Sequence, residues 1–407
     1  MVDKILSIIV PSYNMEQYLP KCLGSLIVAP ELMERLEVLV VNDGSQDRTS
    51  EIAHEFAAKW PGAFKVIDKD NGHYGSCVNV ALKQATGLFV RMLDADDTYD
   101  TNNFGAWLKF VGDHCEDPAF SEVDCIVTDF CTVDANGVKT GDCSYRIAQN
   151  RAIGLDEIPR HYLFAMHAVA WRRELLQRIN YVQSEGIAYT DTEWATYPMI
   201  ATRKLYYSPI VVYRYLIERE GQSMDPQVFK KCIGQRVQMF MRMMREAVKL
   251  DVSNRAKYRM QYVVRSGINA LFLGDVSKSV ALANERMSIV DSLVREFGED
   301  VYGEFNCGVI AKWRKSRHLS ACAIYLIRGK ILINSCMAPI KKIEKRHEER
   351  YRALLKNIED DTVFKKDEKK MWICRNCGHV HIGNNAPEVC PTCNHPQSYF
   401  EVLNNNF

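Results

Sequence analysis

Several features are missing from this 407-residue sequence. No uninterrupted apolar run is long enough to span a bilayer, and the short apolar run near the N-terminus precedes no small-residue cleavage site. The formal net charge of +1 gives no general attraction to nucleic acid. Neither a Walker A sequence nor G-x-G-x-x-G occurs, which argues against kinases, ATPases and dinucleotide-binding enzymes. These absences predict a cytoplasmic protein that does not bind nucleic acid.

The cysteines show no disulfide pattern outside the C-terminal tail. Ten of the 14 cysteines are spread irregularly over the chain, which predicts free buried thiols in a reducing compartment. The sequence also lacks internal repeats and low-complexity segments. Its length predicts two or three domains, and its 47% apolar and 25% charged residues are ordinary for a globular protein.

Short apolar runs alternate with helical patterns over the first hundred residues. The runs at 5–10, 36–41, 64–68 and 88–93 have the composition of buried strands. Helical patterns occupy the intervening segments 16–28, 47–60 and 76–86. This alternation predicts an α/β fold with a parallel, doubly wound sheet, in which ligands bind at the carboxyl ends of the strands.

Polar, acidic or glycine-rich residues follow each of the four predicted strands. They are Pro11-Ser12-Tyr13-Asn14, Asn42-Asp43-Gly44-Ser45, Lys69-Asp70-Asn71-Gly72-His73-Tyr74-Gly75-Ser76 and Asp94-Ala95-Asp96-Asp97. Loops of this kind are often polar because their side chains cap helices. Four such loops at one edge, with three carboxylates inside residues 94–97, favour a binding site instead.

The carboxylates of residues 94–97 predict a bound cation. Such groups repel one another unless a cation lies between them, and hard oxygen ligands suit Mg²⁺ or Mn²⁺ bound together with substrate phosphates. We therefore expect a nucleotide diphosphate here. Pro11 and Asp43 would face its base and ribose, and the glycine-rich loop would allow close backbone approach.

The segments SIIVPSYN, VLVVNDGSQDRT, KDNGHYGSCVN and MLDADD occur in the order and spacing of family 2 glycosyltransferases, which the chain resembles over about residues 4–215. The resemblance implies an inverting enzyme of the GT-A fold, of hexosyltransferase type, with a UDP-linked sugar as the favoured donor. It implies that Asp43 contacts the base and that Asp94 and Asp96 form the D-x-D pair, with Asp96 on the metal. Residues Lys69, Asp70 and Asn71 would line the nucleotide and sugar.

The general base of that family lies in a segment resembled here by residues 189–194, YTDTEW. The resemblance places the base at Asp191, with Glu193 as the alternative, and Thr190 replaces the usual glutamate. Asp191 would take the proton of the attacking acceptor hydroxyl. A helix N-cap is the competing interpretation of Asp191. His167 and Trp171 lie in another segment resembling the family and are expected to be structural.

The segment 312–346 is apolar in its centre and basic at both ends. It fits either an interfacial helix on an anionic membrane, which would suit a lipid-linked acceptor, or a buried helix pair with basic ends. Residues from about 225 to 333 show helical spacing and are expected to pack as core.

Four cysteines in two C-x-x-C pairs, Cys374, Cys377, Cys390 and Cys393, have the spacing of a zinc or iron site. The surrounding sequence resembles the rubredoxin-like tail of rubrerythrins, and residues 339–368 resemble the last helix of their ferritin-like bundle. That helix contains Glu344 and His347 at E-x-x-H spacing. The remaining ligands of a di-iron site are missing, since the other E-x-x-H, Glu51 to His54, lies on a helix of the sheet domain.

The sequence therefore predicts four regions: a GT-A domain at 1–220, a helical region at 221–338, a rubrerythrin-like helix at 339–368 and a rubredoxin-like domain at 369–407. We expect a metal-dependent enzyme that transfers a sugar to a cell-surface glycan or lipid-linked acceptor and needs a divalent metal at the GT-A site. A redox-sensing or interaction metalloprotein with a degenerate transferase domain is the alternative. The tail would hold iron or zinc.

Overall fold

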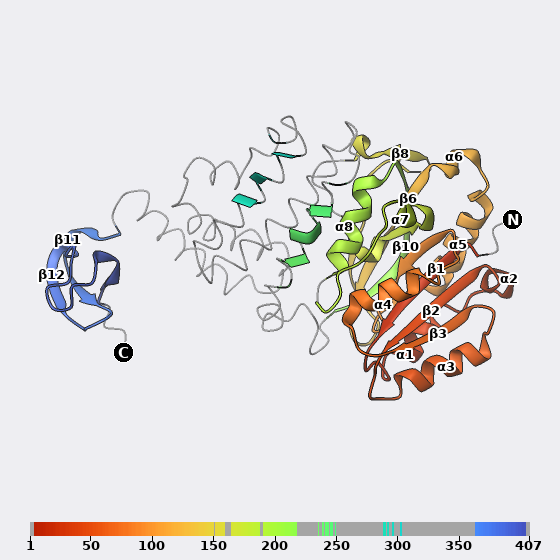
Figure 1. Cartoon of the computed structure of the whole chain (residues 1–407), viewed down its shortest axis with the longest axis horizontal. Coiled ribbons are helices and arrows are strands. Elements are labelled where there is room, and N and C mark those ends of the chain that lie inside the picture. Colours follow the sequence, from red (N-terminus) through yellow and green to blue (C-terminus); the bar gives the residue numbers. More distant parts are fainter. Residues whose placement is uncertain are drawn as a thin grey trace. The chain divides into compact units, whose positions relative to one another are not determined.

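The computed structural model describes residues 4–149, 151–158, 164–187, 190–217 and 363–403, with scattered residues between 235 and 302. The chain divides into two compact units, Met1–Ala311 and Lys312–Phe407 (Figure 1). Most of the expected helical region at 221–338, together with the basic segment and the Glu344–His347 pair, lies outside the described residues. None of the helices that the structure describes has both the length and the apolar character needed to cross a membrane.

Four parallel strands form the first half of a large sheet, as the sequence predicts. They are β1 (Leu6–Ser12), β2 (Leu36–Asp43), β3 (Phe64–Lys69) and β4 (Phe89–Met92), in the order β3-β2-β1-β4. Every residue of β1, β2 and β4 is buried, because helices and loops cover both faces of the sheet. The predicted α/β architecture is confirmed for this part.

The predicted helices are present, but their ends differ. Their bounds are α1 (Leu19–Gly24), α2 (Pro30–Met33), α3 (Thr49–Lys59) and α4 (His73–Leu82). The helix expected over 16–28 stops at Gly24, and Pro30 begins a separate helix, as proline favours a first helical turn. The helix expected over 76–86 begins three residues earlier, at His73, and ends at Leu82.

Beyond β4 the sheet contains strands of both directions. Their bounds are β5 (Thr98–Tyr99), β6 (Val123–Val133), β7 (Lys139–Cys143), β8 (Ala152–Gly154), β9 (Val169–Arg172) and β10 (Lys204–Leu216). Strand β9 is antiparallel to both β4 and β6, and β10 is parallel to β6. The carboxyl ends of β4, β6 and β10 and the amino end of β9 therefore share one edge.

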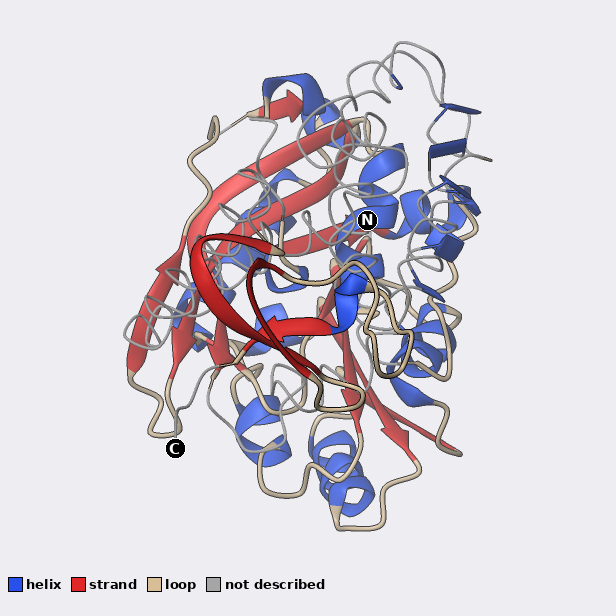
Figure 2. Ribbon diagram, turned by 90° about the vertical axis from the view of Figure 1, so that its left-hand side faces the viewer, coloured by secondary structure: helices blue, strands red, loops and turns tan. Residues whose placement is uncertain are grey.

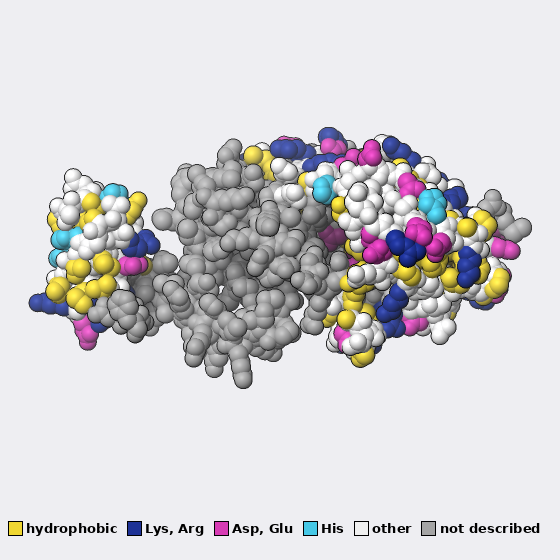
Figure 3. All heavy atoms as spheres, turned by 90° about the horizontal axis from the view of Figure 1, so that it is seen from below, with side chains coloured by type: hydrophobic (Ala, Val, Ile, Leu, Met, Phe, Trp, Pro, Cys, Tyr) yellow, Lys and Arg dark blue, Asp and Glu magenta, His cyan; other side chains and the backbone are white. Residues whose placement is uncertain are grey.

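Four further helices accompany this half of the sheet: α5 (Thr101–His114), α6 (Pro118–Ser121), α7 (Arg173–Arg178) and α8 (Asp191–Ala201). Figure 2 shows the long strands as red ribbons with helices against them. Trp171 is completely buried, and its indole N–H donates to the Trp194 carbonyl at 3.1 Å, so this tryptophan is core as expected. On the face in Figure 3, acidic and basic side chains are interspersed over the described surface, consistent with the near-zero net charge.

The tail is a three-stranded antiparallel sheet in the order β12-β11-β13. The strands are β11 (Lys365–Cys374), β12 (Val380–Asn385) and β13 (Phe400–Val402). Residues 365–368, which the sequence places at the end of a helix, belong to β11 instead. The buried core of this sheet consists of few side chains: Trp372, Cys374, Ala386, Cys390 and Phe400. A core of this size favours additional stabilisation by a metal.

Candidate active site and metal centre

Asp43 ends β2 and holds the glycine-rich loop against it. Its Oδ1 atom accepts from the Lys69 ammonium at 2.6 Å and from the Gly72 backbone N–H at 2.9 Å. The Asp43 side chain is almost fully buried, and Lys69 also donates to the Asp70 carbonyl. Charge-assisted hydrogen bonds of this kind are roughly twice as strong as neutral ones. The loop that carries Asp70 and Asn71 is thus shaped before any ligand binds.

The neighbouring strand ends lie beside this loop. Pro11 and Ser12 are the last two residues of β1 and are buried, and Ser12 pairs in register with Asn42 of β2. Asp70 and Asn71 are exposed. The predicted nucleotide residues therefore lie at one edge of the sheet, with the carboxylate of β2 buried and the residues after β3 open to solvent.

Asp97 anchors the end of β10 to the loop after β4. Its two carboxylate oxygens accept from the Tyr213 hydroxyl at 2.6 Å and from the Leu216 backbone N–H at 2.7 Å. Burial raises the pKa of Asp97 well above its usual range, and the charges of Asp94 and Asp96 raise it further. Because both of its oxygens accept hydrogen bonds from the protein, Asp97 is the structural member of the three carboxylates in residues 94–97.

Asp94 joins the same loop to α4. The Tyr74 hydroxyl donates to Asp94 Oδ1 at 2.8 Å, and the Asp94 backbone N–H donates to the Tyr213 hydroxyl at 3.2 Å. Asp96 is partly exposed and lines a cavity of about 420 Å³. Asp96 thus faces a space where a ligand can bind.

Asp191 lies at the first position of α8 and is partly exposed. Burial raises the pKa of Tyr74 well above its usual range, and the charges of Asp94 and Asp191 add to this. Burial likewise raises the pKa of Tyr215 to about 12, with further contributions from residues 94, 96, 97 and 191. Asp94 and Asp191 both raise the pKa values of Tyr74 and Tyr215, so both carboxylates lie near these two tyrosines. Helix α8 therefore brings the predicted base to the edge of the sheet that holds the predicted D-x-D pair.

The residues around Asp191 have structural partners. Thr190, found where the family has glutamate, is buried and accepts from the Gln183 amide at 2.8 Å through its hydroxyl. Glu193 is also buried, and it accepts from the Ser184 backbone N–H at 2.8 Å and from Arg242 at 2.7 Å. Burial raises the pKa of Glu193, partly offset by these partners. Glu193 is therefore an anchor of the segment before α8.

That segment also contacts α4. The Asn79 amide exchanges hydrogen bonds with the backbone of Gln183, at 2.9 Å and 2.8 Å, and donates to Glu185 at 2.7 Å. The Gly186 N–H donates to the Gly72 carbonyl at 3.2 Å. We call these contacts the α4 brace. It connects the glycine-rich loop with the chain that leads to Asp191.

His167 lies at this edge although its sequence context predicts only a structural role. One imidazole nitrogen and carboxylate oxygens of Asp94 and Asp97 all lie within 4.8 Å of one another. The ring stacks on Tyr215 with centroids 4.5 Å apart. Burial, together with the charge of Arg91, lowers the pKa of His167 to about 3, so the ring is neutral at physiological pH. The sequence alone does not show that His167 lies at this edge. Its position follows from the antiparallel pairing of β9, which it precedes, with β4.

The four cysteines of the tail form one cluster. The Sγ atoms of Cys374 and Cys393 are 3.7 Å apart, and those of Cys377 and Cys390 are 3.6 Å apart. Four thiolates bound tetrahedrally at about 2.3 Å from a metal lie about 3.8 Å from one another. All four Sγ atoms fall within 4.8 Å, so the ligand set fits one tetrahedral ion.

Two similar turns hold the cluster. The Gly378 N–H donates to the Cys374 carbonyl at 2.8 Å, and the Asn394 N–H donates to the Cys390 carbonyl at 2.9 Å. Gly378 and Asn394 both have positive φ, 76° and 55°, which these two residue types tolerate best. Each C-x-x-C pair is thus followed by the residue that its turn requires.

Comparison with known proteins agrees with this geometry. Residues 7–177 match the model of glycosyl transferase family 2. The chain carries a family 2 glycosyltransferase domain. Residues 372–401 match the model of the rubrerythrin rubredoxin-like domain, so the glycosyltransferase domain is followed by a rubredoxin-like one.

Individual relatives fall into two groups. Rubrerythrin-1 of Clostridium acetobutylicum is 57% identical over 68 residues, which are 17% of this chain and 35% of the relative. The minor teichoic acid biosynthesis protein GgaB of Bacillus subtilis is 26% identical over 221 residues, 53% of this chain and 23% of the relative. The chain thus spans about a third or less of the curated relatives it matches.

Solved structures support the fold. S. aureus TarS 1–349, crystallised with UDP-GlcNAc, superposes with a TM-score of 0.56 at 18% identity, covering 94% of this chain and 97% of that one. At this identity the likeness concerns the fold alone. The predicted GT-A fold and rubredoxin-like tail are confirmed.

Proposed function

We propose that the glycosyltransferase domain transfers a sugar, of hexose type, from a nucleotide-sugar donor to an acceptor hydroxyl with inversion. The observation that carries this proposal is that Asp94 and Asp191 both lie near enough to Tyr74 and Tyr215 to raise the pKa of each hydroxyl, and Asp96 acts in the same way on Tyr215. A UDP-linked donor is our first choice because the similarly folded TarS was crystallised with UDP-GlcNAc.

In this proposal the nucleotide lies over the ends of β1, β2 and β3. The buried Asp43 carboxylate would accept from the base, and Pro11 and Ser12 would form the floor of the pocket. Asp70 and Asn71, held by the contacts of Lys69 with Asp43, would flank the ribose and sugar. The support for these roles is the shared edge and the preformed loop.

Asp96 of the D-x-D pair would contact a divalent cation, Mn²⁺ or Mg²⁺, on the donor diphosphate, and Asp94 would line the nucleotide sugar beside it. Oxygen ligands of this kind suit both ions, and such an ion neutralises the charge on a departing diphosphate. Asp96 lines a cavity, so a ligand can reach it. Tyr74 donates to Asp94 and so fixes one of the two carboxylates.

Asp191 would act as the general base. The acceptor oxygen forms a bond with the anomeric carbon while the bond from that carbon to the diphosphate oxygen breaks. The hydroxyl proton passes to Asp191. Glu193 is the weaker candidate, because Ser184 and Arg242 already occupy its oxygens.

The acceptor in this proposal is a cell-surface glycan or a lipid-linked precursor, consistent with the similarity to a teichoic acid biosynthesis protein. We propose that the reaction takes place in the cytoplasm, at the inner face of the membrane, where the basic segment 312–346 would make peripheral contact. The four predicted regions remain our proposal for the domain organisation. The tail would bind iron or zinc through Cys374, Cys377, Cys390 and Cys393.

Nucleotide release from a panel of nucleotide sugars, measured with Mn²⁺ for the wild type and Asp96→Asn, tests the proposal. We expect slow release from one donor and at least about 100-fold less in the variant, since the variant loses charge on the diphosphate metal. The control is Asp113→Asn, which alters an exposed carboxylate paired with Lys109 on α5. Full activity of Asp96→Asn would refute the metal assignment. If no donor is cleaved, calorimetry with UDP decides whether the domain binds nucleotide at all.

The alternative is a redox-sensing or interaction protein in which the tail carries the function. This alternative predicts that Cys374→Ser abolishes the cellular effect while Asp96→Asn does not. The transferase proposal predicts the reverse for sugar transfer. Comparing the two variants in the producing cell separates the hypotheses.

A further inference from the structure

His167 lies beside the D-x-D loop, residues 94–97, and has no role in the proposed function. It belongs to the single-turn helix η2 (Met166–Ala168), directly before β9. Strand β9 pairs antiparallel with β4, with Ala170 opposite Arg91. Continuing this register by three residues places His167 opposite Asp94, and one imidazole nitrogen lies within 4.8 Å of an Asp94 carboxylate oxygen.

Three aromatic rings hold this imidazole in place. Tyr215 stacks on it with ring centroids 4.5 Å apart, Tyr213 meets it edge-on at 4.7 Å, and Phe130 lies at 5.2 Å. The Tyr213 hydroxyl also donates to Asp97 at 2.6 Å and accepts from the Asp94 backbone N–H at 3.2 Å. The imidazole and the D-x-D loop are thus fixed against the same tyrosine.

One atom of the imidazole lacks a partner. His167 Nδ1 is buried and makes no hydrogen bond within the part of the chain that the structure describes. Burial and the charge of Arg91 lower the pKa of the ring to about 3, so it is neutral and one nitrogen has a lone pair. Nearly all buried polar atoms in proteins have a partner, and an exception calls for an explanation such as a bound ion.

A cation at the D-x-D loop would be within reach of this ring. Ligand atoms lie about 2.1 Å from such an ion, and the imidazole nitrogen is within 4.8 Å of the loop carboxylate of Asp94. Asp94 and Asp96 bring two carboxylates to the loop. The opposing cation is Arg91, which is completely buried and donates to the His167 backbone carbonyl at 2.7 Å, not to the ring. Carboxylates therefore outnumber cations around the imidazole.

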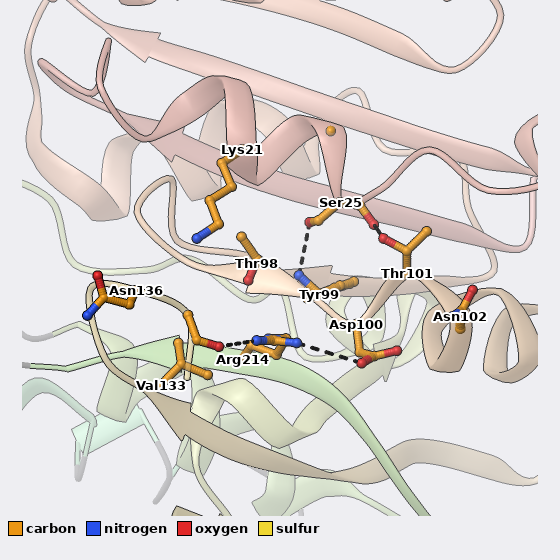
Figure 4. Close-up of a pocket in the computed structure, with 12 residues that line it drawn as sticks. Lys21, Ser25, Thr98, Tyr99, Asp100, Thr101, Asn102, Val133, Asn136 and Arg214 are labelled. Atoms are coloured by element: carbon orange, nitrogen blue, oxygen red, sulfur yellow. Dashed lines mark hydrogen bonds and ion pairs between the residues drawn. The ribbon is translucent and has the colours of Figure 1, made fainter. Parts of the chain in front are cut away.

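The neighbouring cavity is less suited to a cation. It has a volume of about 590 Å³, and its charged lining residues are Lys21, Asp100 and Arg214. In Figure 4 Arg214 lies between Asp100 and the turn that carries Asn136, with a guanidinium nitrogen 3.9 Å from an Asp100 oxygen. The other Asp100 oxygen caps α5 by accepting from the Asn103 N–H at 3.0 Å. Two cationic side chains and one carboxylate line this cavity, so we expect a divalent ion at the imidazole instead.

We propose that His167 is a ligand of the divalent cation that Asp96 contacts, so that the site combines carboxylate and imidazole ligands. This inference rests on the proposed transferase function and adds a ligand to its metal. A nitrogen ligand favours transition-metal ions over Mg²⁺, which takes oxygen ligands. The site should therefore prefer Mn²⁺ to Mg²⁺, and this preference should depend on His167.

Pulsed EPR of bound Mn²⁺ tests the inference, because a nitrogen ligand gives a hyperfine coupling that oxygen ligands do not. The sample is the full chain with one equivalent of Zn²⁺ to occupy the tail thiolates, then one equivalent of Mn²⁺ and UDP. We expect a nitrogen coupling that changes to that of the heavy isotope when the protein is produced with isotope-labelled histidine. This comparison needs no substitution, so it does not depend on how a variant folds.

His167→Phe identifies which histidine is bound, since phenylalanine keeps a ring among the three aromatic neighbours and removes both nitrogens. We expect the variant to lose the coupling. Its Mn²⁺ affinity in calorimetry should fall at least about tenfold, because losing even a group that only orients a ligand typically costs about 10–100-fold. Its Mg²⁺ affinity should change less. The matched control is His114→Gln, an exposed histidine at the end of α5, which should keep the coupling and both affinities.

Bound Mn²⁺ without a histidine coupling would overturn the inference, and so would a coupling that persists in His167→Phe. In either case, donor cleavage that needs Mn²⁺ and decreases in Asp96→Asn would show that the transferase function still stands. A wild-type chain that binds neither Mn²⁺ nor UDP and cleaves no donor would refute the function together with the inference.

Discussion

Replacing Gly75 with alanine should disturb the glycosyltransferase site. A Cβ atom at Gly75 would lie 1.8 Å from the Ser184 carbonyl oxygen, and real Cβ contacts are almost never shorter than 3.0 Å. The two segments must therefore separate by about 1 Å or more, since both atoms belong to packed backbone. That separation acts directly on the α4 brace.

The expected cost follows from those contacts. Overpacking of this kind typically destabilises a protein by about 1–3 kcal/mol, which is a decrease in melting temperature of about 2–4 °C for each kcal/mol in a domain of this size. The brace bonds of Asn79, at 2.7–2.9 Å, would lengthen beyond hydrogen-bond range. Because a displacement of about 1 Å near reacting groups can cost about 100-fold in rate, we expect donor cleavage to decrease by that order.

The assay combines thermal unfolding with donor cleavage and UDP binding for Gly75→Ala. Gly62→Ala is the matched control, because Gly62 has no heavy atom within 4 Å of an added Cβ. We expect the control to match the wild type in all three measurements. Wild-type stability and activity in Gly75→Ala would show that the brace does not position Asp191, and the reasoning would be refuted.

The remaining predictions concern the base, acid stability and the tail. Asp191→Asn should lower the rate of transfer by about 100- to 10,000-fold with UDP affinity unchanged, whereas Glu193→Gln should lower the free energy of unfolding by about 1–3 kcal/mol; the opposite pattern would exchange their roles. Burial alone would raise the pKa of Glu37, but hydrogen bonds from Lys65, Ser7 and Thr86 lower it. The contribution of Glu37 to the free energy of unfolding is therefore fully present above pH 4.5, the ordinary pKa of a glutamate, and is lost as the pH falls through the lower pKa of the folded state. In urea titrations, Glu37→Gln should lose less stability on acidification than the wild type. Removing the tail metal with a chelator should abolish the amide-proton dispersion of residues 365–403 in NMR spectra and leave the signals of the glycosyltransferase domain in place, and unchanged tail signals would argue against a structural metal.

Much of the first half of the fold could be predicted because three of its four strands, β1, β2 and β4, are buried on both faces. Continuous β-branched runs at β1 and β2 leave little choice of secondary structure, and the parallel alternation then brings Asp43 and Asp94 to one edge. The cysteine cluster could also be predicted, since the spacing of its ligands is local in the sequence. In both cases the information lies within a few neighbouring residues.

His167 and Tyr213 could not be placed from the sequence. His167 precedes β9, whose antiparallel position between β4 and β6 depends on pairing over long sequence separations. Tyr213 lies in β10, more than a hundred residues after Asp97, and its hydroxyl donates to that carboxylate. Long-range register, and not local pattern, determines these contacts.

The α4 brace has a consequence for building chimeric transferases. Consider a chimera that joins two related chains at a junction somewhere after β4. In this chain Asn79 and Gly75 of α4 lie against residues 183–186, at hydrogen-bond distance and without room for a methyl group. A functional hybrid therefore needs residues 72–79 and 183–193 from the same parent, so these two segments must be inherited together.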